Sequence, residues 1–151
     1  MEASFEANER AGPPQRRPRV LIVDDDAALR LVCATVLGLE GYEVIEAANG
    51  QEALELARTA APDVMLLDIS MPVLDGFGVA AALRSDQRTR ELPFVFLTGE
   101  LDPQVIRQGG EVGAAGFFTK PFDPVAVAAY IRHIVEVRLA TAFEPAGGHA
   151  F

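Results

Sequence analysis

The sequence predicts an α/β fold in which five parallel strands form a doubly wound sheet with helices on both faces. Three observations predict it. Strand-like and helix-like segments alternate five times within about 120 residues, which is typical of βαβ units. Two strand segments are continuous apolar runs, as expected for strands buried on both faces. The 151 residues are 50% hydrophobic, which is enough to bury the core of one domain.

The strands are predicted from their apolar patterns. Val20-Leu-Ile-Val23 and Val64-Met-Leu-Leu67 are uninterrupted runs, whereas the segment from Tyr42 to Ala47 alternates between apolar and polar residues. In chain order, the five strands are expected at residues 20–23, 42–47, 64–67, 93–97 and 115–119.

The helices between them are predicted from 3.6-residue periodicity and from capping residues. Asn49 and Glu52 resemble a capping box that opens the second helix, which Pro62 ends. Further helices are expected at residues 79–84, at residues 103–111 and around residues 127–137. The first helix is expected to end before Gly41 and to carry an apolar stripe of Ala28, Leu31, Val32, Thr35, Val36 and Leu39.

Composition excludes several classes of protein. A net charge of −9 argues against direct binding of nucleic acid, which needs clustered lysine and arginine. No apolar run approaches the roughly 20 residues of a membrane span, and the N-terminus lacks the pattern of a secretory signal. The single Cys33 cannot form an internal disulfide, so we expect a cytoplasmic protein.

We predict three segments: a flexible leader at residues 1–18, one folded domain at 19–140 and a flexible C-terminal tail at 141–151. The leader is rich in proline and glycine. Arg16 and Arg17 of the leader, with Arg19, could bind phosphoinositide or nucleic acid, but a solvated tail is the favoured interpretation. The eleven residues of the tail leave no room for an output domain, unless the chain is a fragment of a longer protein.

Polar side chains directly follow four of the predicted strands, at the edge where doubly wound sheets bind ligands. They are Asp24, Asp25 and Asp26 after the first strand, Asp68 after the third, Thr98 after the fourth and Lys120 after the fifth.

This set favours a cation and a phosphoryl group. Carboxylates about 5 Å apart repel by about 3 kcal/mol per pair at an effective dielectric constant near 20. A cation must therefore offset this repulsion. Oxygen ligands without histidine or cysteine favour Mg²⁺, with Mn²⁺ as the alternative. Lys120 is the only lysine beside twelve arginines, which indicates a site that needs a compact charge.

Simpler roles also fit some of these residues. Asp26 could cap the first helix and pair with Arg30, and Asp75 could cap the helix that follows it. Cys33 is expected in the core, and His133 on an exposed helix surface. His149 belongs to the predicted tail.

Four motifs together identify a family. In order, they are Val20-Leu-Ile-Val-Asp-Asp-Asp26, Leu67-Asp-Ile-Ser-Met-Pro-Val-Leu-Asp-Gly76, Phe96-Leu-Thr-Gly99 and Phe118-Thr-Lys-Pro-Phe122. They resemble the receiver domain of bacterial two-component response regulators, of the single-domain CheY-like type. The resemblance covers roughly residues 19–139, and it implies a flavodoxin-like (βα)5 fold with strand order 2-1-3-4-5.

The resemblance implies a role for each residue. Asp68 would be the phosphoacceptor, which takes a phosphoryl group from the phosphohistidine of a sensor histidine kinase. Asp24, Asp25, Asp68 and the backbone carbonyl of Ser70 would hold Mg²⁺. Three carboxylates, one Mg²⁺ and one lysine sum to zero charge, so an incoming phosphoryl group meets no net repulsion.

The remaining roles concern the response to phosphorylation. Thr98 and Lys120 would contact phosphoryl oxygens, and a cis peptide before Pro121 would aim the lysine. Thr98 and Phe117 would act as the switch residues. Ser70 stands where an asparagine is common in relatives, and this position and Glu100 flank the path of hydrolytic water there, so the resemblance does not fix the lifetime of the phosphoryl group.

By resemblance, the protein is a signalling phosphoacceptor that assists its own phosphotransfer and dephosphorylation, and not an enzyme. Its expected partners are a sensor histidine kinase and a histidine phosphotransfer protein or downstream effector, without nucleic acid or membrane. The fourth helix, fifth strand and fifth helix would form the docking surface or a phosphorylation-dependent homodimer. Because Gly109 and Gly110 weaken the fourth helix, we expect it to be mobile and reshaped by phosphorylation.

Two alternatives compete with this interpretation. A receiver-fold interaction module could work without phosphorylation. A phosphatase-type enzyme could use Asp68 as a covalent nucleophile, but it would need a second acid two residues later, where this chain has Ser70.

Overall fold

A single parallel sheet forms the centre of the molecule. The structure is a computed structural model that describes the backbone of residues 16–143 and the side chains of residues 16–138. The strand order is β2-β1-β3-β4-β5, which confirms the predicted topology. The strands are β1 (Arg19–Val23), β2 (Glu43–Ala47), β3 (Val64–Asp68), β4 (Phe94–Thr98) and β5 (Gly116–Thr119).

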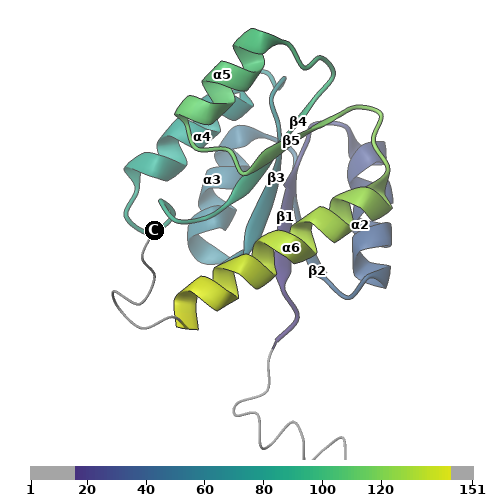
Figure 1. The fold of residues 1–151 in the computed structure, drawn as a ribbon. Coiled ribbons are helices and arrows are strands. Elements are labelled where there is room, and N and C mark those ends of the chain that lie inside the picture. The colour runs from purple at the N-terminus through teal and green to yellow at the C-terminus, as the bar shows by residue number, and fades with distance from the viewer. Residues whose placement is uncertain (1–15, 144–151) are drawn as a thin grey trace, which may run out of the picture.

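Helices cover both faces of this sheet. They are α2 (Ala27–Leu39), α3 (Gly50–Thr59), α4 (Gly76–Ser85), α5 (Pro103–Glu111) and α6 (Pro124–Phe143). Helices α2 and α6 lie on one face, and α3, α4 and α5 lie on the other (Figure 1). In the part of the chain that the structure describes, no helix has both the length and the apolarity needed to cross a membrane.

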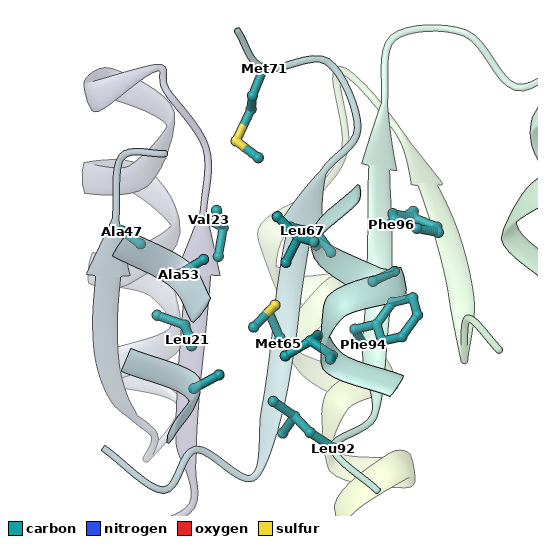
Figure 2. Packing of buried hydrophobic residues seen from close by; sticks show 14 of the residues in the cluster. Leu21, Val23, Ala47, Ala53, Met65, Leu67, Met71, Leu92, Phe94 and Phe96 are labelled. Atoms are coloured by element: carbon teal, nitrogen blue, oxygen red, sulfur yellow. The ribbon is translucent and has the colours of Figure 1, made fainter. Parts of the chain in front are cut away.

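Two apolar layers arise from the alternation of side chains along each strand. Leu21 and Val23 of β1 belong to the layer beneath α3 and α4, whereas Val20 and Ile22 belong to the layer beneath α2 and α6. Figure 2 shows the first of these layers, which continues into β3 and β4. Because both faces are covered, the central strands consist of continuous apolar runs.

The predicted caps are present. The Asp26 carboxylate accepts hydrogen bonds from the backbone of α2, and Asp75 caps α4. Asn49 caps α3, while Glu52 reaches back to the N–H of Ala48, as in a capping box. The cap at Asp75 explains why α4 begins at residue 76, three residues before the predicted start.

The prediction that the apolar stripe of α2 faces the core is wrong. Leu31, Val32 and Leu39 are exposed, whereas Cys33 and Leu37 are buried against the sheet. This helix has apolar residues on all sides, so periodicity alone does not show which side faces the sheet. Burial raises the pKa of Cys33 to about 11, in keeping with its predicted core role.

Described structure is present on both sides of the predicted domain boundaries. Arg17, predicted to lie in the leader, donates hydrogen bonds to the carbonyls of Gly38, Gly41 and Tyr42 at the end of α2. Helix α6 continues to Phe143, past the predicted boundary at residue 140. Residues 1–15 and 144–151, including His149, lie outside the described part.

The loop between β3 and α4 contains a residue with a strained backbone conformation. Val73 has a φ of 71°, which is unfavourable for a β-branched residue, and its side chain is 99% exposed. We therefore expect Val73→Asn to raise the free energy of unfolding by about 1 kcal/mol, because asparagine tolerates this conformation and no packing is lost. Chemical denaturation measures the change. Val32→Asn, on the regular backbone of α2, should give no gain, and an equal gain there would contradict the explanation.

Candidate functional site

Three carboxylates and one ammonium group meet at the carboxyl edge of the sheet. One oxygen atom from each of Asp24, Asp25 and Asp68 lies within 4.8 Å of the others. The ammonium nitrogen of Lys120 lies 2.8 Å from Oδ2 of Asp24 and 3.2 Å from Oδ1 of Asp68. The ends of β1, β3 and β5 bring these residues together, as their positions after the predicted strands indicated.

Asp24 is the fully buried member of this cluster. Its Oδ1 accepts a hydrogen bond from the N–H of Asp26, which holds the turn into α2. Its Oδ2 pairs with the Lys120 ammonium and has no other polar partner among residues 16–138. A buried carboxylate oxygen is costly without further partners, so this atom is suited to a cation.

The environment of Asp68 raises its pKa to about 6, first through burial and then through the charge of Asp24. Lys120 and a hydrogen bond from the N–H of Ser70 oppose that rise. Burial alone would lower the pKa of Lys120, but its contacts with Asp24 and Asp68 raise it overall. Near neutral pH, Asp68 is therefore mainly ionised, and Lys120 carries a positive charge.

These residues fit a hard divalent cation. The ligand atoms are all carboxylate oxygens, two of the residues are buried, and one oxygen lacks a hydrogen bond. Mg²⁺ prefers such oxygens and usually keeps several waters, for which the exposed position of Asp25 leaves room. Ser70 follows Asp68 by two residues, at the same edge of the sheet.

We expect the affinity for Mg²⁺ to fall as the pH falls through about 6. A cation competes with the proton on Asp68, so affinity should drop up to about tenfold per pH unit below that value. Isothermal titration calorimetry with MgCl₂ at pH 5 and pH 8 measures the difference. The Asp68→Asn variant is the control, since its weaker binding should depend much less on pH over this range. Equal affinity of the native chain at both pH values would contradict the prediction.

Thr98 lies at the end of β4, next to the strand that carries Asp68. It is 6% exposed, and its hydroxyl donates to the carbonyl of Glu100 while accepting from the N–H of the same residue. Its own carbonyl accepts a hydrogen bond from the N–H of Lys120, which ties together the two loops of the site. A β-carbon at Gly99 would meet no atom within 4 Å, so the space beside Thr98 is open.

Phe117 lies on β5, half-buried between the sheet and α5. Its ring centroid is 5.9 Å from that of Phe96. A β-carbon at Gly109 of α5 would overlap this ring, with Cε2 of Phe117 only 2.6 Å away. The glycine therefore has a packing role that its predicted effect on helix mobility does not include.

Two residues that support the site, Gly76 and Arg30, were not assigned supporting roles from the sequence. Gly76 lies against the backbone of Asp68, and a β-carbon there would be 2.8 Å from the Cα of Ile69. Arg30 was predicted to pair with Asp26, but its guanidinium donates to the carbonyl of Asp24 and pairs with Glu46. The sequence signal for Gly76 was the Asp-Gly pair before α4. No local pattern signalled the role of Arg30, because its partner Glu46 lies on a different element, β2.

Comparison with known proteins decides the family. A family model described as the response regulator receiver domain matches residues 20–132. The chain belongs to this family. Receiver domains are the phosphoacceptors of two-component signalling, and the acidic cluster of this receiver domain lies at the carboxyl edge of its sheet. The cis peptide implied by the resemblance is present between Lys120 and Pro121.

The receiver domain is similar to several named proteins. It is 40% identical over 129 residues to the probable transcriptional regulator ycf27 of Guillardia theta, covering 85% of this chain and 50% of that protein. It is 44% identical over 123 residues to the response regulator PleD of Caulobacter vibrioides, covering 80% and 27%. The solved structure of the chemotaxis protein CheY4 of Vibrio cholerae has a TM-score of 0.75 and 36% identity, covering 78% of this chain and 98% of CheY4.

These relatives differ in length. The chain spans about half the length of the ycf27 proteins and about a quarter of PleD. It covers nearly all of the CheY4 chain. The similarity therefore concerns the receiver domain alone.

Proposed function

We propose that Asp68 is the phosphoacceptor of this receiver domain and takes a phosphoryl group from the phosphohistidine of a sensor histidine kinase. The observation that carries the proposal is the contact of a buried Asp68 carboxylate with Lys120, beside Asp24 and Asp25. Of the carboxylates in this cluster, Asp68 is the one that lies at the end of a central strand next to Thr98.

In the proposed reaction, a carboxylate oxygen of Asp68 attacks the phosphorus, and the bond from phosphorus to the histidine nitrogen breaks. A pKa of about 6 keeps Asp68 mainly ionised at neutral pH, so no general base is needed. The ammonium of Lys120 lies where it can pair with a phosphoryl oxygen. Thr98 can donate to another oxygen after it releases the carbonyl of Glu100.

Asp24, Asp25 and Asp68 would hold Mg²⁺, together with the backbone carbonyl of Ser70, and Mn²⁺ would fit the same oxygens. When bound, the ion supplies positive charge to balance the phosphoryl oxygens. Asp24 has a further task here, since its buried Oδ2 positions the Lys120 ammonium. Arg30 supports Asp24 from behind through its carbonyl.

The proposed switch runs from Thr98 to Phe117. If Thr98 leaves Glu100 for a phosphoryl oxygen, the end of β4 changes beside the Phe117 ring. That ring packs on α5, so the surface formed by α5, β5 and α6 is the part that would change. These elements are the fourth helix, fifth strand and fifth helix of the predicted docking surface, which would bind an effector, a histidine phosphotransfer protein or a second copy.

We expect the backbone amides of α5 to exchange faster than those of α2 in the unphosphorylated protein. Gly109 is the only buried residue of α5, and two consecutive glycines lower its helical stability. Hydrogen exchange followed by mass spectrometry measures this difference. Similar protection in α5 and α2 would contradict the predicted mobility of α5.

We further propose that the domain works as a signalling phosphoacceptor, assisting its own phosphorylation and dephosphorylation, and has no separate substrate. A sensor histidine kinase would supply the phosphoryl group in the cytoplasm. A phosphatase of related chemistry is disfavoured, because it would need a second acid two residues after Asp68, where this chain has Ser70.

Intact-mass measurement tests the proposal. The chain is incubated with acetyl phosphate and Mg²⁺, with EDTA in a parallel sample and with the Asp68→Ala variant as control. We expect a gain of one phosphoryl group that requires both Mg²⁺ and Asp68. A folded protein that binds Mg²⁺ but gains no mass would instead support the interaction module that works without phosphorylation.

A further inference from the structure

A pocket lies at the opposite edge of the sheet from Asp68, beneath the starts of β3 and β4. Its volume is about 370 Å³. Four arginines from distant parts of the sequence line it, together with two carboxylates. They are Arg16, Arg58, Arg88 and Arg138, with Asp63 and Glu91.

The structure gives this pocket an excess of positive charge. Four arginines against Asp63, Glu91 and the Asp86 carboxylate that pairs with Arg88 leave a net of one positive charge, in a chain whose net charge is −9. Asp63 does not neutralise the rest, because both of its oxygens are occupied. Arg16 forms two hydrogen bonds to them, at 3.1 and 3.2 Å, and the N–H of Arg19 donates to one of them at 2.7 Å.

Two of the arginines have no hydrogen bond to a segment distant in sequence within residues 16–138. Arg88 is 67% exposed and pairs only with Asp86, two residues away, among the residues that the structure describes. The Arg58 side chain makes no hydrogen bond or ion pair within residues 16–138, although, after the hydrogen bonds from Arg88, its charge helps to lower the pKa of Asp86. By contrast, Arg16 joins Asp63, and Arg138 donates to the Asp63 carbonyl. Arg58 is therefore available to a ligand, whereas Arg88 would have to exchange Asp86 for one.

Apolar groups form the other part of the pocket. Ala57, Pro62 and Leu92 are buried residues that line it. The pocket thus combines an apolar surface with guanidinium groups around it. Its volume falls within the roughly 300–1,000 Å³ that is typical of small-molecule sites. Guanidinium groups bind phosphate oxygens through paired hydrogen bonds.

We propose that this pocket binds a small organic phosphate of the size of a nucleoside monophosphate. The phosphate contacts Arg58 and takes the place of Asp86 on Arg88, while the organic part covers the apolar surface of Ala57, Pro62 and Leu92. A volume of about 370 Å³ is large enough for a single ring system with one phosphate-bearing sugar or similar group. The site is independent of phosphorylation at Asp68, because it lies at the other edge of the sheet.

Calorimetric titration of the full chain tests the proposal, with AMP, adenosine and inorganic phosphate as probes and EDTA present throughout. We expect saturable binding of AMP and at least about tenfold weaker binding of adenosine and of inorganic phosphate. The double variant Arg58→Gln/Arg88→Gln should weaken AMP binding by at least about tenfold. The Asp68→Asn variant should bind AMP like the native chain, so failure of the phosphoacceptor proposal would not affect this result.

Arg107→Gln is the matched control. Arg107 is an exposed arginine on α5 outside the pocket, so its replacement changes the net charge as each pocket substitution does. We expect AMP affinity to remain within about twofold of the native value. Three results would overturn the proposal: no saturable AMP binding, equal loss with Arg107→Gln, or unchanged binding in the double variant. Inorganic phosphate binding as tightly as AMP would overturn the assignment of an organic phosphate.

Discussion

Asp68→Asn is expected to abolish phosphorylation and, in metal-free buffer at pH 8, to raise the free energy of unfolding by about 2 kcal/mol. The carboxylate is 2% exposed and lies beside Asp24, which together raise its pKa from 3.8 to about 6. A pKa that is higher in the folded state means that ionisation of Asp68 destabilises the fold. The neutral amide removes that cost and also removes the proposed nucleophile. Urea denaturation and intact-mass measurement check the two effects.

The pH dependence of this effect has a definite sign. Well below the unfolded pKa of 3.8, Asp68 is protonated in both the folded and unfolded states, so native chain and variant should differ little. As the pH rises from 3.8 to about 6, the native chain loses the stability that the protonated Asp68 contributes, and the difference grows until it levels off above the folded pKa. Asp25→Asn is the control, because this carboxylate is exposed and its replacement should change stability by less than about 0.5 kcal/mol. A destabilised Asp68→Asn protein at pH 8 would refute the argument.

Gly109→Ala and Gly110→Ala are expected to change stability in opposite directions, although the two glycines are adjacent in α5. A β-carbon at Gly109 would overlap the Phe117 ring and approach Phe96 to 3.4 Å. We expect Gly109→Ala to lower the free energy of unfolding by about 1–3 kcal/mol, as overpacking does. A β-carbon at Gly110 meets no atom within 4 Å, so Gly110→Ala should raise it by up to about 1 kcal/mol.

A double variant tests whether the Phe117 ring is the cause. Combining Gly109→Ala with Phe117→Leu should recover part of the loss, because the smaller side chain leaves room for the new methyl group. Phe117→Leu alone gives the reference for this cycle, and thermal or chemical denaturation measures each stability. Additive effects of the two substitutions would show that Gly109 and Phe117 are not coupled. Coupling would support the proposal that α5 responds to the position of this ring.

Local sequence signals were sufficient for the elements and for their order. Continuous apolar runs identified β1 and β3, because strands covered on both faces need no polar positions. The caps at Asn49 and Asp75 were predictable, since capping depends on residues within one turn. The convergence of Asp24, Asp68 and Lys120 followed from topology alone, because parallel strands end at one edge of the sheet.

Other features depend on contacts between segments that are distant in sequence, so only the tertiary structure decided them. The buried side of α2 depends on how the helix lies on the sheet, which an almost uniformly apolar helix does not reveal. Arg30 contacts Asp24 and Glu46 because β2 lies beside β1. Gly109 is required by the ring of Phe117, and the arginine pocket joins four segments that no local pattern relates. Sequence thus determined what lies within one element or at one end of a strand, and side-chain packing between elements determined the rest.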